Sequence, residues 1–65
     1  MALSQKQRDK IAIRTILKQM GSATYPDIAL RGGEGLASPL MEMVQAGEVI
    51  RETEERTTYR LAKPD

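Results

Sequence analysis

Residues 24–47 read TYPDIALRGGEGLASPLMEMVQAG, and this stretch decides the fold. It contains two apolar patterns with helical spacing, which are separated by a glycine-rich break over residues 32–35 and closed by Gly47. The charged stretch EVIRETEERTTYRLA follows at once, over residues 48–62, and its alternation is typical of β-strands. The predicted order is therefore a helix, a turn, a second helix and a hairpin.

A longer helix is predicted ahead of this stretch, from about Gln5 to Met20. Ser4 is a suitable N-cap for it, and Gln7 completes a capping box. Gly21 is expected to end the helix. Apolar residues at i, i+3, i+4 and i+7 form its buried stripe, and these are Ile13, Ile16, Leu17 and Met20. Basic residues lie at i, i+4 and i+8 on the other side, and these are Lys10, Arg14 and Lys18.

The helix within residues 24–33 is expected to begin after Thr24 as its N-cap, with Pro26 in the first turn. It should stop at residues 31–33, where two glycines follow an arginine. The buried face of this helix is assigned to Ile28, Ala29 and Leu30.

The next helix has two alternative starts. It begins at Leu36, or Ser38 caps it and Pro39 is its first residue. In both cases it ends at Ala46, and Gly47 takes a positive φ because the hairpin follows without a linker.

The hairpin is predicted from strands at about Glu48–Thr53 and Thr57–Ala62, with residues 54–56 at the tip. Alternation places Tyr59 and Leu61 on the core side, alongside Val49. Because a two-stranded sheet is marginally stable, a short third strand at residues 22–24 is also predicted.

Composition excludes several classes of function. The 65 residues suffice for a single domain, spanning 1–65, and they include no Cys and no His. Thiolate metal sites and imidazole chemistry are thus absent, and no paired-carboxylate or nucleophile motif occurs. We therefore predict no catalytic residue, no metal, no cofactor and no enzyme activity. The longest apolar runs fall short of a membrane span, which predicts a cytoplasmic protein without a membrane partner.

The net charge of +1 is unevenly distributed. Residues 1–31 carry six basic and two acidic side chains, a net +4, whereas residues 32–65 carry four basic and seven acidic ones, a net −3. The basic half either faces an anionic polymer or forms a solvated helix face.

The spacing of eleven residues resembles that of the winged helix-turn-helix family, across nearly the whole chain. These residues are Ile16, Leu17, Thr24, Ile28, Ala29, Leu40, Met43, Gly47, Val49, Tyr59 and Leu61. The family includes small bacterial and phage DNA-binding regulators, and the pattern assigns no subfamily within it. The resemblance implies an α+β fold with three helices followed by a β-hairpin wing.

It also implies a transcriptional regulator that binds double-stranded DNA without catalysis. In such proteins the third helix lies in the major groove and the wing touches the backbone or the minor groove. Carried over to this chain, the DNA-binding residues are Tyr25, Arg31, Ser38, Met41, Glu42, Gln45, Arg51, Arg56 and Arg60. Helix 1 lysines would hold phosphates. Because one such module buries only roughly 600–1,000 Å² on DNA, a homodimer is also expected.

An alternative function remains open on chemical grounds. The third helix lacks Arg, Lys and Asn, the side chains that most often read guanine and adenine, and the wing tip contains Glu54 and Glu55. These features suit a winged-helix module that binds a protein partner through helix 3 or the wing. A continuous positive face would favour DNA, whereas a neutral or acidic face would favour protein.

Overall fold

The computed structural model describes residues 3–63. Its elements are α1 (Gln5–Met20), β1 (Ser22–Ala23), α2 (Tyr25–Gly32), α3 (Ala37–Gln45), β2 (Val49–Thr53) and β3 (Thr57–Leu61). The three strands form one antiparallel sheet in the order β1-β3-β2. The chain is thus a small α+β domain, an arrangement compatible with a winged helix.

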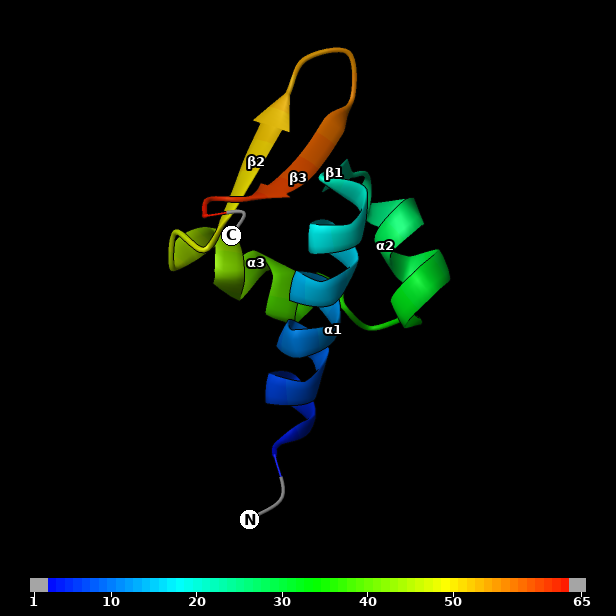
Figure 1. The fold of residues 1–65 in the computed structure, drawn as a ribbon, viewed down its shortest axis with the longest axis vertical. Coiled ribbons are helices and arrows are strands. Elements are labelled where there is room, and N and C mark those ends of the chain that lie inside the picture. The colour runs from blue at the N-terminus through cyan, green and yellow to red at the C-terminus, as the bar shows by residue number, and fades with distance from the viewer. Residues whose placement is uncertain (1–2, 64–65) are drawn as a thin grey trace.

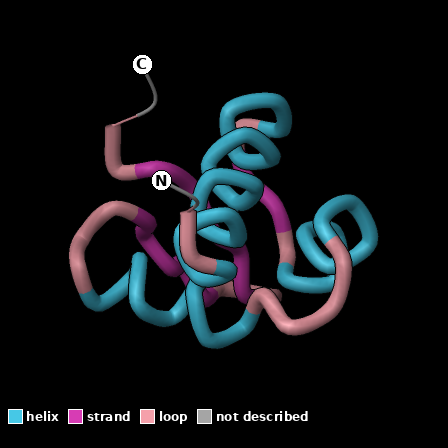
Figure 2. The backbone as a smooth tube through the Cα atoms, turned by 90° about the horizontal axis from the view of Figure 1, so that it is seen from below, coloured by secondary structure: helices cyan, strands magenta, loops and turns pink. Residues whose placement is uncertain are grey.

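The molecule is elongated, with extents of 41 × 23 × 20 Å. In Figure 1, α1 runs along the long axis, its N-terminal turns form one end and the β2–β3 hairpin forms the other. Seen from below in Figure 2, α1 lies between α2 and α3. The first turns of α1 and the tip of the hairpin therefore project from opposite ends of a central core.

The boundaries of α1 agree with the prediction. The Ser4 hydroxyl accepts a hydrogen bond from the Gln7 amide at 3.2 Å, and the Gln7 side chain accepts one from the Ser4 amide at 3.3 Å. Gly21 caps the other end with a φ of 80°. The apolar stripe is confirmed, because Ile13, Ile16 and Leu17 are buried and Met20 packs against them.

The start of α2 is also confirmed, but its buried face is not. Thr24 and Asp27 form a reciprocal capping box, with the Asp27 amide donating to the Thr24 hydroxyl at 3.4 Å. Ile28 is fully buried and Ala29 is half-buried, whereas Leu30 is 87% exposed, so its assignment to the core is wrong. Successive helical residues point about 100° apart, so three consecutive residues cannot share one narrow face.

The third helix begins at Ala37, with Leu36 as its N-cap and no capping bond from a side chain. The alternative with Ser38 as the cap is therefore wrong. Pro39 is buried as the third residue of the helix. An N–H at this position would have no partner four residues earlier within the helix, so proline disturbs nothing. The first helical bond runs from the Leu40 amide to the Leu36 carbonyl, at 2.9 Å.

Gly47 joins α3 to the sheet directly. Its φ is 82°, as predicted, and two hydrogen bonds close the helix end: Gly47 N–H to the Val44 carbonyl at 3.1 Å, and Glu48 N–H to the Met43 carbonyl at 2.9 Å. This pair of bonds is the Schellman motif. The strand begins at Val49, one residue later than predicted.

The sheet register places the side chains that were predicted to face the core on the side of the helices. Val49 pairs with Leu61 and both are buried, while Tyr59 is half-buried and packs on the core. The third strand is shorter than predicted, because Ser22 and Ala23 pair with β3 whereas Thr24 caps α2.

The core is aliphatic and draws on every helix and strand. Its residues are Ile13, Ile16, Leu17, Ala23, Ile28, Leu36, Leu40, Met43, Val49 and Leu61. Across residues 3–63, no helix combines the length and the apolar character needed to cross a membrane.

Candidate functional site

The outward face of α3 is the surface on which most of the candidate residues were expected. Ser38, Met41 and Gln45 are all exposed, and Met41 keeps 44% of its surface accessible. Their positions in the helix place them on one side, opposite Leu40 and Met43. In the described part of the chain, the side chains of Ser38 and Gln45 make no hydrogen bond within the molecule. These three residues therefore form an uncharged strip that is available to a partner.

Glu42 borders that strip, one helical turn from Ser38 and from Gln45. It is half-buried at the edge of α3, and its carboxylate contacts the Lys6 ammonium at 2.8 Å and the Lys10 ammonium at 3.5 Å. The hydrogen bond from Lys6 is the main cause that lowers the pKa of Glu42 below its ordinary value. The N-terminal turns of α1 cross the edge of α3 here, so the carboxylate contacts two lysine ammonium groups as well as solvent.

A second ion pair continues the same contact. The Arg14 side chain donates from Nε and from Nη2 to one carboxylate oxygen of Glu48, at 3.0 and 2.8 Å. Together with Glu42, this pair joins the basic first half of the chain to the acidic second half. The charge asymmetry of the sequence is thus partly satisfied inside the molecule. The basic half is neither a purely solvated face nor a fully free cationic surface.

Tyr25 and Arg31 lie near opposite ends of α2. Tyr25 begins the helix, is half-buried and packs against the core. Arg31 is exposed in the last turn. The helix therefore separates the two residues, and Arg31 is the more exposed of them.

The wing arginines are divided between its two faces. Arg51 pairs with Tyr59 in the register and so shares the helix-side face with the buried Val49. Arg60 lies on the other face, where its Nε donates to Glu52 at 2.8 Å. Only Arg51, of these two, is free of an ion pair within the described residues.

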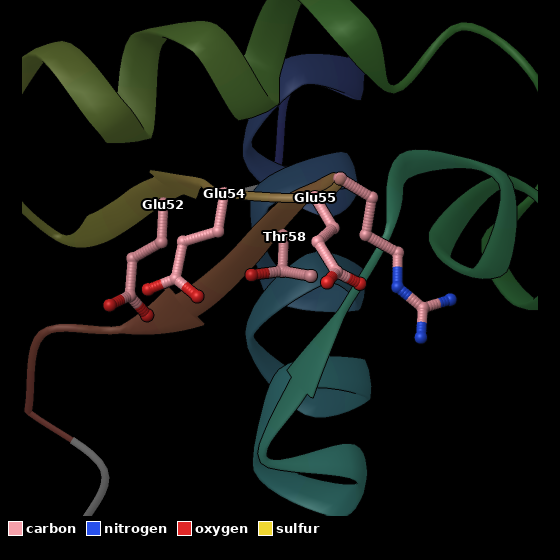
Figure 3. A pocket seen from close by; sticks show the side chains of 5 residues that line it. Glu52, Glu54, Glu55 and Thr58 are labelled. Atoms are coloured by element: carbon pink, nitrogen blue, oxygen red, sulfur yellow. The ribbon is translucent and has the colours of Figure 1, made fainter.

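Carboxylates gather around the wing tip. A shallow pocket of about 290 Å³ is lined by Glu52, Glu54, Glu55, Arg56 and Thr58. Figure 3 shows the three glutamate side chains and the Thr58 side chain extending to the same side of the hairpin. Such a surface repels phosphate. In residues 3–63, no cluster of acidic side chains has the arrangement to hold a metal ion.

Arg56 also reaches the start of α2. Together with Thr58 it lines a second shallow cleft of about 180 Å³, whose other side includes Thr24 and Asp27. The Arg56 side chain therefore lies beside the N-terminus of α2.

Helix 1 lysines were expected to hold phosphates, but the predicted DNA-binding residues did not include Lys6, Lys10, Arg14 or Glu48, whose ion pairs join α1 to α3 and to the residue before β2. One signal was available, because Lys6, Lys10, Arg14 and Lys18 recur every four residues. Their carboxylate partners lie more than thirty residues away in the chain, as for Arg14 and Glu48 with a separation of 34. No local pattern could have paired them.

Comparison with protein-family models, with curated proteins and with solved structures finds no match to this chain.

Proposed function

We propose that this domain is a winged helix-turn-helix module that binds duplex DNA and acts as a transcriptional regulator without catalysis. The outward strip of α3 carries this proposal, because Ser38, Met41 and Gln45 are exposed on one side of a short helix. An α-helix with its side chains is about 10–12 Å across, and the major groove is about 12 Å wide. The strip can therefore face base edges.

The three side chains of the strip can distinguish only a few DNA bases. Gln45 can form a bidentate contact with adenine, Ser38 can bond to any base, and Met41 can touch a thymine methyl group. With no cation on α3, affinity has to come from phosphate contacts made by neighbouring elements. Arg31, Arg51 and Arg56 are exposed and form no ion pair within the described residues, so they suit that role.

The test is a salt titration of binding to random and candidate operator duplexes. The logarithm of the association constant should fall with the logarithm of salt concentration, by roughly 0.9 for each phosphate neutralised. Arg31→Ala should weaken binding to all sequences alike. Gln45→Ala should change preference among sequences more than overall affinity. A folded protein that binds no duplex at low salt would exclude this function.

A protein-binding module is the second candidate, and one observation favours it. The outward strip of α3 is uncharged with an exposed methionine, and the pocket at the hairpin tip is acidic. Such a surface suits a protein better than a phosphate backbone. If duplex binding is absent, affinity capture with wild type and Met41→Ala would compare partner retention. Equal retention by both proteins would argue against a contact through α3.

A further inference from the structure

Four cations form a ridge along α1. Lys6, Lys10, Arg14 and Lys18 recur every four residues, which spaces them by about 6 Å along the helix axis. The ridge therefore spans about 18 Å. Lys18 and Arg14 also line a cleft of about 430 Å³ that includes Lys63, so the cationic surface continues toward the end of β3.

Two carboxylates pair with three of the four cations of this ridge. Glu42 contacts Lys6 and Lys10, and Glu48 contacts Arg14. All of these side chains are partly exposed, with side-chain accessibilities from 26% to 56%. Exposed ion pairs contribute little to stability and are screened by salt, so another anion can replace the carboxylates at small cost.

The ridge flanks the strip that we propose to enter the groove. Glu42 lies on α3 one helical turn from Ser38 and from Gln45, so the ammonium groups that hold it adjoin the strip directly. When a helix lies in the major groove, the phosphates of the two strands run along its sides. Each strand of B-DNA carries a phosphate about every 3.4 Å of helix axis, so a ridge of this length can reach several.

We propose that the α1 ridge is a phosphate-binding surface for duplex DNA, and that Glu42 and Glu48 compete with the phosphates for it. This inference rests on the proposed function. In free protein the two glutamates hold three of the four cations of the ridge. On binding, phosphate oxygens replace the carboxylates as partners of Lys6, Lys10 and Arg14. The glutamates therefore limit affinity and restrict binding to low salt or to DNA that offers additional contacts.

The experiment measures binding of a random-sequence duplex as a function of salt. The variants are Glu42→Gln and Glu48→Gln, with Glu34→Gln as the matched control. Glu34 is exposed in the turn before α3 and forms no ion pair within residues 3–63, so its removal changes net charge equally but releases no cation. Glu42→Gln should bind roughly three- to tenfold tighter than wild type. The steepness of its salt dependence should rise by roughly 0.9 per additional phosphate contacted.

A double variant keeps the outcomes separate. Lys6→Gln/Lys10→Gln should bind more weakly and with a shallower salt dependence. If wild type binds duplex but this variant binds equally well, or if Glu42→Gln gains no more than Glu34→Gln, the ridge proposal is overturned and the proposed function stands. If Glu42→Gln raises the affinity for polyglutamate as much as the affinity for duplex DNA, the ridge binds anions in general, and the assignment of DNA as its ligand is overturned. If no variant binds duplex, both the proposed function and the ridge proposal fail.

Discussion

Gly47 sits at the only position between α3 and β2 where the backbone has to take a positive φ. Its value of 82° lies in the region that side chains rarely adopt, and a Cβ there would meet nothing within 4 Å. Substitution is therefore opposed by backbone strain and not by crowding. The Glu48 bond to Met43 depends on the same conformation.

Gly47→Val should lower the free energy of unfolding by more than about 1 kcal/mol, because valine is poorly tolerated at positive φ. Gly47→Asn is the control, since asparagine accepts this conformation more readily. Urea unfolding followed by circular dichroism measures both. Equal stabilities for the valine variant and wild type would contradict the role given to this glycine.

Leu61 and Leu30 provide a matched pair for testing the core. Leu61 is 9% exposed and Leu30 is 87% exposed. Leu61→Ala should cost roughly 2–4 kcal/mol, whereas Leu30→Ala should change stability by less than about 0.5 kcal/mol. Thermal and urea unfolding of the two variants check this. Similar losses in both would contradict the observed burial.

The same two leucines show when the burial of a side chain could be predicted from the sequence. Leu61 was assigned correctly because strand alternation has a period of two and Val49 fixes its phase. Leu30 was misassigned because helix α2 has only eight residues, too few for its periodicity to define a face. The ion pairs of Glu42 could not be predicted for a different reason, since its partners Lys6 and Lys10 come from a remote segment of the chain.

At the level of the helices, the ion pairs of Glu42 join α3 to α1, and their contribution to stability depends on pH. Lys6 and Lys10 lower the pKa of Glu42, so ionised Glu42 stabilises the folded state. This contribution is present above the unfolded-state pKa, near 4.5, and is lost as pH falls through the lower folded-state value. Above that window Glu42 is ionised and pairs with Lys6 and Lys10.

Glu42→Gln should therefore be slightly less stable than wild type near neutral pH, because the ion pairs are exposed, and the difference should vanish at strongly acidic pH. Urea unfolding at several pH values measures the two proteins. Glu34→Gln serves again as the comparison, because its carboxylate has no cation within the described residues. A stability difference that stays constant down to acidic pH would show that the ion pairs are not its source.

Helix and strand limits were predictable because their signals are local. Both N-terminal capping boxes and the glycine at the end of α3 involve residues within a few positions of each other. The start of α3 was left between two alternatives because no side chain caps it. The candidate interface was less predictable, since ion pairing across distant segments decides which cations are free.

For the whole molecule, the sheet order has a consequence for folding kinetics. The strand β3 lies between β1 and β2, and it follows every other element in the chain. Local hairpin closure can join β2 to β3 early, whereas pairing of Ser22 with Arg60 requires closure of a long loop. During synthesis, α1, α2 and α3 therefore emerge before the strand that covers their apolar sides. Until Leu61 is available, these helices expose the surface that a chaperone recognises or that promotes aggregation.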